Sequence, residues 1–297
     1  MNDAMAMPQY DRRVEDLGNI VELGHVNVTV PDQHKATAFY FMGLGLTRDP
    51  YLMAGVENMW VNVGRGQFHL PTRDPAQVVR GTTALVLPDR EALLRRLSGV
   101  RKYLEGTKFD FCESNDGVET ICPWGNRIRV HTPDPNRFGA MRVGMPYVEF
   151  DVPEGTSLWG IARFYTEILG AIAGVAKDER GPYAWASTSM ESKVIYRETD
   201  KPLPEYDGHH IQITLADFSG PHRKLQERGL ITEESDQHQY RFLDIVDVDT
   251  NKPLFRIEHE TRSMRHPMFN RTFINRNPDM NNRNFVPGYE VGIWALN

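Results

Sequence analysis

The feature that most constrains this chain is a pattern that occurs four times. Each copy is an eight-residue segment that alternates like a β-strand and ends in an acidic residue, where a helix would begin. The segments start 57, 65 and 63 residues apart, so each repeat is a supersecondary module and not one turn of a solenoid. The four segments are HVNVTVPD (25–32), TTALVLPD (82–89), YVEFDVPE (147–154) and HIQITLAD (210–217).

The residues after each segment predict the rest of the module. A run with apolar spacing near 3.6 residues and a glycine at its end predicts a helix, and pieces rich in β-formers with turn residues follow it. The first and third helices share Phe39-Tyr40 and Phe164-Tyr165, so the chain reads as a duplicated pair of modules. The predicted fold class is α+β, with four tandem β-α-β-β-β modules.

The repeat also sets the predicted domain boundaries. Modules one and two form a first domain over residues 21–138, and modules three and four form a second over residues 143–262. Residues 1–20 are polar and aperiodic, and residues 263–297 are rich in Asn, Arg and Pro. We expect these ends to be an arm and a tail that pack on the core or are partly disordered, without chemistry of their own.

Composition excludes several classes of function. A net charge of −6 supplies no basic surface for nucleic acid. The longest apolar stretch, residues 168–176, is interrupted by two glycines and is far shorter than the roughly 20 residues that span a bilayer. The first residues lack an apolar signal region, and Cys112 and Cys122 cannot form a disulfide framework, so we expect buried or half-buried thiols in a cytoplasmic protein.

The first strands of modules one and four carry candidate ligands. Because alternate side chains of a strand point to opposite faces, His25 shares a face with Asn27 and Thr29, and valines occupy the other face. His210 lies equivalently, together with Gln212 and Thr214. A single histidine of this kind is usually structural, but its recurrence at an equivalent position predicts a polar face that lines a cavity.

The last strand of each module can be aligned by its distance from the first strand. This alignment places His69 and Glu258 at matching positions in modules one and four. Imidazole and carboxylate groups bind divalent first-row metals well. The corresponding residues of modules two and three bind them poorly, which predicts one metal per chain; these residues are Thr82, Arg129, Tyr147 and Tyr196.

The tandem modules, the strand-Pro-Asp helix start, the Phe-Tyr…Leu-Gly helix end and the motif PWGNRIRV (123–130) resemble the vicinal oxygen chelate superfamily. That superfamily contains glyoxalase I, extradiol dioxygenases and bleomycin-binding proteins. The resemblance, over about residues 20–260, implies two cup-shaped mixed sheets with helices outside. It also implies that first and last strands of paired modules donate metal ligands, here His25, His69, His210 and Glu258.

The resemblance leaves two ways to pair the modules. The usual extradiol pattern joins modules three and four, which would offer Tyr147 where a histidine is expected. The glyoxalase pattern exchanges modules between the pairs, so that modules one and four share a cup and all four candidate ligands meet. We prefer this second pairing. His69 then stands where glyoxalase I typically has a carboxylate.

Three imidazoles and one carboxylate around a divalent ion leave two coordination positions open and favour an anionic oxygen substrate. A dioxygenase with Fe(II) is the first prediction, acting on a small molecule with adjacent oxygens. The alternatives are a glyoxalase-like isomerase or lyase with Zn, Ni, Mn or Co, in which Glu258 is both ligand and base, and a non-enzymatic small-molecule binder. A homo-oligomer is compatible with all of these.

Other polar residues near the candidate ligands receive lesser roles. His209 should face away from His210 as a surface residue or as a residue that supports the ligands. Glu260 shares a face with Glu258; it is predicted to be a solvated charge, with a role as reserve ligand or base as the alternative. Arg129 is predicted to pair with an internal acid.

Overall fold

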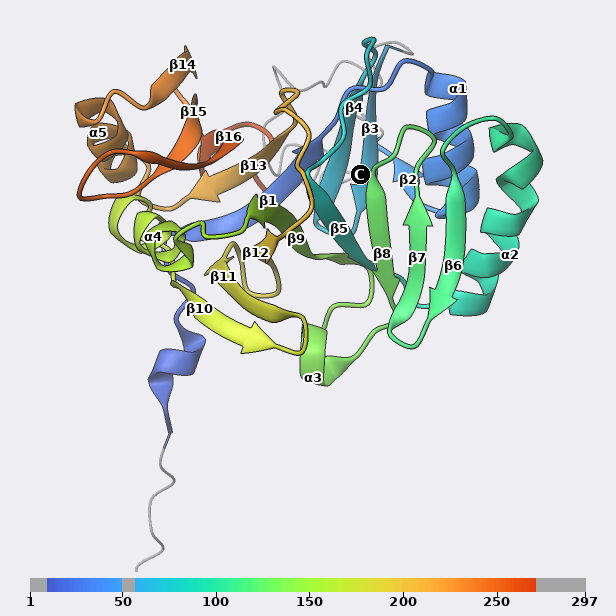
Figure 1. Cartoon of the computed structure of the whole chain (residues 1–297), viewed down its shortest axis with the longest axis horizontal. Helices are drawn as coiled ribbons and strands as arrows, with labels where there is room; N and C mark the ends of the chain where they lie inside the picture. Colours follow the sequence, from blue (N-terminus) through green and yellow to red (C-terminus); the bar gives the residue numbers. More distant parts are fainter. Residues whose placement is uncertain (1–9, 50–56, 271–297) are drawn as a thin grey trace, which may run out of the picture.

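A computed structural model describes residues 10–49 and 57–270, and in them two eight-stranded mixed sheets form the body of the molecule (Figure 1). The first sheet has the order β14-β15-β16-β13-β1-β4-β3-β2. Its strands are β1 (Ile20–Asn27), β2 (Thr47–Arg48), β3 (Asn58–Val63), β4 (Gly66–Pro71), β13 (His210–Leu215), β14 (Ile231–Asp236), β15 (Gln239–Val246) and β16 (Pro253–Ser263).

The second sheet has the equivalent order β10-β11-β12-β9-β5-β8-β7-β6. Its strands are β5 (Gly81–Val86), β6 (Asp110–Ser114), β7 (Gly117–Ile121), β8 (Arg127–His131), β9 (Gly144–Pro153), β10 (Ala173–Asp178), β11 (Gly181–Ser187) and β12 (Lys193–Thr199).

The strand order decides the pairing of the modules. In the first sheet, β1 runs antiparallel to β13 and parallel to β4, so module one joins module four. In the second, β5 runs antiparallel to β9, so module two joins module three. The predicted fold class and the preferred pairing of modules one and four are therefore confirmed. Each sheet draws on both halves of the chain, and the domain boundaries at residues 138 and 143 remain a prediction.

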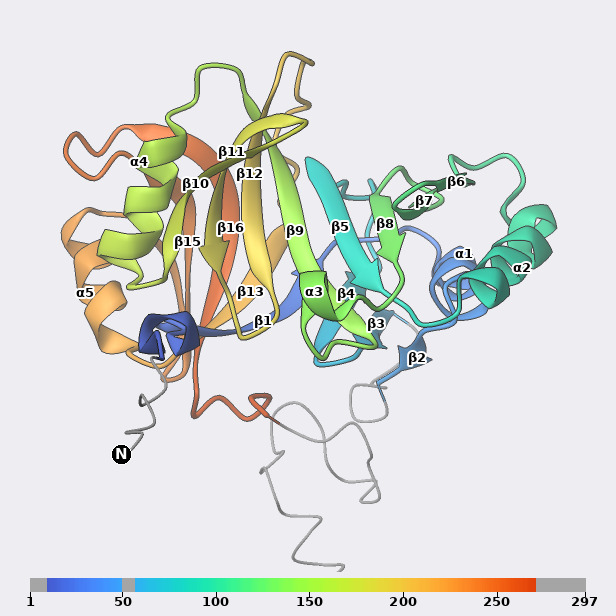
Figure 2. The same ribbon diagram turned by 90° about the horizontal axis from the view of Figure 1, so that it is seen from below.

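Helices flank the sheets at the two ends of the molecule, with α4 and α5 at one end and α1 and α2 at the other (Figure 2). Their bounds are α1 (Gln33–Ala36), α2 (Arg90–Val100), α3 (Pro135–Phe138), α4 (Leu158–Arg163) and α5 (Ser219–Glu227). A π-helical turn continues α1 as η2 (Thr37–Gly43) and α4 as η4 (Phe164–Ile168); η3 (Arg101–Leu104) and η1 (Arg12–Glu15) are 3₁₀ turns. No helix of the described residues is long and apolar enough to cross a membrane.

Three of the four predicted acidic helix starts are confirmed. The carboxylates of Asp32, Asp89 and Asp217 accept backbone N–H groups of the first helical turn. The expectation for Glu154 is wrong. A turn follows β9, and the hydroxyl of Ser157 accepts the Gly160 N–H to begin α4.

A buried hydrogen-bond network joins the two sheets through η4. The Tyr165 hydroxyl on η4 lies 2.5 Å from the Tyr196 hydroxyl on β12 and 2.6 Å from His259 Nε2 on β16. Burial lowers the pKa of His259 to about 3, so the ring is neutral; Nδ1 donates to the Ile257 carbonyl and Nε2 accepts from Tyr165. This network explains the Phe-Tyr signature of the third module, because its tyrosine ties the helix to both sheets.

Three further expectations can be compared with the structure. Cys122 is buried as expected, whereas Cys112 is exposed, and both thiols are free. Tyr196, which the alignment by distance matched with His69 and Glu258, lies in the core and packs against Phe150. Of the predicted arm and tail, residues 1–9 and 271–297 lie outside the described residues.

Candidate metal centre

Three strands of the first sheet bring together a cluster of potential metal ligands. His25 on β1, His210 on β13 and Glu260 on β16 each offer a ligand atom within 4.8 Å of the other two. All three side chains are buried. Val26, Val28 and Val30 occupy the opposite face of this part of the chain and belong to the core, as the alternation predicted.

The free atoms of the cluster fit a divalent ion. Nε2 of His25 and Nε2 of His210 are buried and have no hydrogen-bond partner, although buried polar atoms are nearly always paired. They lie 4.0 Å and 3.6 Å from the two Glu260 carboxylate oxygens. Two imidazoles and one carboxylate with open positions are the ligand set of non-haem Fe(II) oxygenases, and Zn, Mn, Ni and Co accept the same donor types.

The protonation states also suit metal binding. Burial holds the pKa of His25 well below its usual range, so its imidazole is neutral. Burial raises the pKa of the Glu260 carboxyl, but the neighbouring Arg262 and His210 outweigh it and lower that pKa well below its usual range. At neutral pH the cluster thus offers the neutral imidazole of His25 and the carboxylate of Glu260, which are the forms that bind a cation.

Two arginines contact the carboxylates of this cluster. Arg241 lies 2.6 Å from both Glu258 Oε1 and Glu260 Oε2, and Arg262 Nη2 lies 2.7 Å from Glu260 Oε1. Glu258 also lies 3.3 Å from Nδ1 of His210. A carboxylate beside Nδ1 favours the proton on Nδ1 and leaves the lone pair of Nε2 free to bind a metal. This arrangement is usual for histidines that bind metals.

Two of the four predicted ligands lie in the cluster and two lie beside it. His25 and His210 lie in the cluster. The His69 ring lies 5.6 Å from the His25 ring, stacks on Trp60, and has its Nε2 2.6 Å from Asn58 Oδ1. Glu258 is beside the cluster, with 23% of its side chain exposed. Ligation by His69 and by Glu258 remains a prediction. The expectation that Glu260 is solvated is wrong, because only 4% of the residue is exposed.

Strand pairing explains why Glu260, and not Glu258, corresponds to His69. Directly opposite the first-strand residues His25, Thr82, Tyr147 and His210 lie Gln67, Arg127, Lys193 and Glu258. Two positions further along, on the same face, lie His69, Arg129, Ile195 and Glu260. Glu260 is thus the true counterpart of His69. Counting residues from the first strand missed this because the connections within the modules differ in length.

The other polar residues considered in the sequence analysis have structural positions. His209 faces away from His210 and is buried, with its Nδ1 2.6 Å from Asp207, so it supports the loop and is not a surface residue. Arg129 pairs with Glu119 as predicted. Tyr147, which the extradiol pairing would have brought to the metal, belongs to the second sheet.

Sequence reasoning missed the wall of the site. A cavity of about 590 Å³ lies beside the cluster and is lined in part by Trp60, His69, Arg241, Glu260 and Arg262. Period-two alternation placed Arg262 on the face of Glu258 and Glu260, and this was a usable signal. Nothing local pointed to Trp60 or Arg241, because β3 and β15 reach the site only through sheet pairing.

The buried histidines give the chain a predicted pH dependence. Burial lowers the pKa of His25 and brings the pKa values of His69, His259 and His266 to about 3. Between pH 3 and about 6.5 the unfolded chain therefore binds protons that the folded chain does not. We expect the free energy of unfolding of chelator-treated protein to fall as the pH drops below about 6.5, by up to about 1.4 kcal/mol per unit for each histidine.

Urea titrations at pH 7.5 and 5.5 measure this effect. His259→Phe is the matched variant, because it removes one of these histidines and should show a shallower pH dependence. Equal or greater stability of the wild type at pH 5.5 would contradict the prediction.

Comparisons with known proteins agree on the fold. No protein-family model matches the sequence, and no curated protein matches it. A Bacillus subtilis protein described as a "putative dioxygenase" is similar over 94% of this chain and 95% of its own, with a TM-score of 0.57 and 13% identity. Glyoxalase I from Zea mays is similar over 83% of this chain and 93% of its own, with a TM-score of 0.56 and 13% identity. The chain thus shares its fold with these two proteins, and this is the fold that the resemblance predicted.

Proposed function

We propose that this chain is a metal-dependent dioxygenase with the vicinal oxygen chelate fold, in which His25, His210 and Glu260 hold one divalent ion, preferably Fe(II). The observation that carries the proposal is that Nε2 of His25 and Nε2 of His210 are buried, have no hydrogen-bond partner and lie beside the Glu260 carboxylate. Such an ion, when bound, supplies a Lewis acid for a substrate with adjacent oxygens and an open position for dioxygen.

The charges around the cluster favour an anionic substrate. Glu258 and Glu260 are balanced by Arg241 and Arg262, and burial keeps the imidazole of His25 neutral. A divalent ion added to this balanced set leaves an excess of positive charge. Arg241 and Arg262 also line the cavity beside the cluster, so their remaining donors are in reach of a catecholate or enediolate.

Glu258 is suited to move a proton. It is partly exposed, so it can exchange protons with water, and it touches His210 and Arg241. We assign it the role of general base toward a substrate hydroxyl. The same carboxylate is the observation that favours the second candidate, a glyoxalase-like isomerase or lyase, because such a reaction needs a base beside a carbon acid.

Oxygen uptake separates the two candidates. Protein loaded anaerobically with Fe(II) is mixed with catechols, enediols and α-hydroxycarbonyl compounds and then exposed to air in an oxygen electrode. We expect substrate-dependent oxygen consumption with at least one member of the panel, and none with His210→Ala.

The opposing result is turnover of a hemithioacetal under nitrogen, supported by Zn or Ni. It would reject the dioxygenase in favour of the isomerase. Binding of these compounds by protein that never takes up a metal would reject both enzymes in favour of a small-molecule binder.

A further inference from the structure

The second sheet forms a cup with a cavity of its own. The cavity has a volume of about 570 Å³ and is lined from β8, β9, β11 and β12 and the loops beside them. Its strands β9, β8 and β12 are the first and last strands of modules two and three, so they correspond to the strands that build the metal centre of the first sheet. A volume of this size is usual for a small-molecule site.

This second cup has no metal ligands where the first cup has them. Tyr147 and Ile195 stand at the positions that His210 and Glu260 occupy in module four. Within residues 10–49 and 57–270, the cluster of the first cup is the one group of histidine, cysteine and acidic side chains with metal-binding geometry. A ligand of the second cup would therefore be held by the protein alone.

The floor of the second cup is apolar and aromatic. Ala84, Val86, Phe138, Tyr147 and Ile195 form a hydrophobic cluster that is separate from the main core. Tyr183 and Trp185 pack against this cluster, are only partly buried, and line the cavity. An aromatic ring placed here would gain stacking contacts and remove apolar surface from water.

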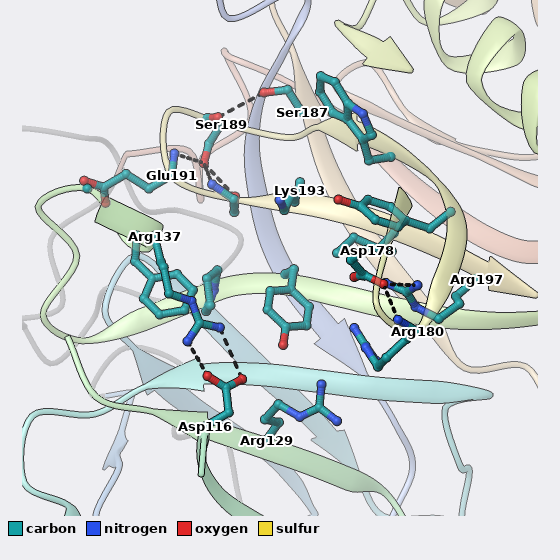
Figure 3. Close-up of a pocket in the computed structure, with 18 of the residues that line it drawn as sticks. Asp116, Arg129, Arg137, Asp178, Arg180, Ser187, Ser189, Glu191, Lys193 and Arg197 are labelled. Atoms are coloured by element: carbon teal, nitrogen blue, oxygen red, sulfur yellow. Dashed lines mark hydrogen bonds and ion pairs between the residues drawn. The ribbon is translucent and has the colours of Figure 1, made fainter. Parts of the chain in front are cut away.

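Most of the basic side chains around this cavity are neutralised by carboxylates, as Figure 3 shows for Arg137 with Asp116 and for Arg197 with Asp178. Each of four arginines has its own acidic partner. The pairs are Arg129 with Glu119, Arg137 with Asp116, Arg180 with Glu149, and Arg197 with Asp178.

Lys193 is the exception. It lies between these groups (Figure 3), and among the described residues no carboxylate forms an ion pair with its ammonium group. Burial and the nearby Arg137 lower the pKa of Lys193, as expected for an ammonium group without a carboxylate beside it. An anion bound beside it would supply the missing negative charge.

We propose that the second cup is a metal-independent binding site for an aromatic carboxylate, with the ring on Tyr183 and Trp185 and the carboxylate at Lys193. The site is independent of the metal centre, which lies in the other sheet. Its recognition has two separable parts. The aromatic floor binds the ring, and the ammonium group of Lys193 selects the charge.

Benzoate is the probe that tests this site. Calorimetric titration of the full, chelator-treated chain should show saturable binding of one benzoate. Benzamide, which has nearly the same shape without the charge, should bind at least about 10-fold more weakly, since charge-assisted hydrogen bonds are roughly twice as strong as neutral ones. Trp185→Leu should also weaken benzoate binding by removing part of the aromatic floor.

Variants of single lysines and of the first cup complete the experiment. Lys193→Met should weaken benzoate binding at least about 10-fold, whereas Lys177→Met, on β10 but outside the cavity lining, should bind as the wild type does. Arg241→Gln, in the first cup, should leave benzoate binding intact. The proposal is overturned if benzoate does not bind at 10 mM, if Lys193→Met binds it normally, or if Arg241→Gln abolishes binding. None of these outcomes depends on whether the first cup is a dioxygenase.

Discussion

Replacing Glu260 with glutamine will remove the stoichiometric metal from a protein that still folds. The carboxylate is one of three clustered candidate ligands, and the other two are imidazoles, so glutamine removes the one carboxylate among them. Loss of an outer partner of a metal ligand already costs about 10–100-fold in affinity, and loss of the ligand itself should cost more. Elemental analysis after anaerobic reconstitution with Fe(II) should find one ion per chain in the wild type and almost none in Glu260→Gln or His210→Ala.

Glu258→Gln is the matched control, because Glu258 is on the same strand and face and contacts the same arginine. We expect it to weaken metal binding less than Glu260→Gln does, by about 10–100-fold as for the loss of an outer partner, and to lose activity. The reverse pattern, with metal lost in Glu258→Gln and kept in Glu260→Gln, would make Glu258 the ligand. Two ions per chain in the wild type would contradict the single site. Circular dichroism of each variant separates loss of metal from loss of fold.

His69 needs its own measurement. The sequence places it among the ligands, but its Nε2 contacts Asn58 and its ring stacks on Trp60. We expect His69→Ala to weaken metal binding less than His25→Ala does. An equal loss in both variants would make His69 a fourth ligand.

The second large effect concerns stability. His259→Ala should lower the free energy of unfolding by about 3–5 kcal/mol, since it creates a cavity in the core and leaves the buried Tyr165 hydroxyl without its acceptor. In proteins of roughly this size each kcal/mol shifts the melting temperature by about 2–4 °C. Thermal unfolding of chelator-treated protein measures the shift without a contribution from an ion at the neighbouring candidate metal centre.

Conservative variants separate the hydrogen bonds of this network from packing. Tyr165→Phe removes the central hydroxyl and both of its hydrogen bonds, whereas Tyr196→Phe removes one, so the first variant should be the less stable. Because Tyr165 contacts both Tyr196 and His259, a variant that combines these substitutions should lose less than the sum of the single losses. A melting temperature of His259→Ala within about 2 °C of the wild type would show that the network does not hold the sheets together.

The sequence by itself determined the four modules and which side chains of the first strands share a face. A strand alternates every second residue whatever its neighbours are, so the pattern at His25 and His210 could be interpreted without knowing the sheet. The fourfold spacing likewise predicted four equivalent units. Both features are local, and the structure keeps them.

Only the tertiary structure decided which residues meet. The pairing of modules one and four, and the choice between Glu258 and Glu260, depend on which strands become neighbours and in what register. Register is set by backbone pairing across a sheet, while distances along the sequence also include connections of unequal length. The same reason hid the contacts of Arg241 with both glutamates and of Tyr165 with His259, because each joins elements that are distant in the sequence and adjacent only after the sheets have formed.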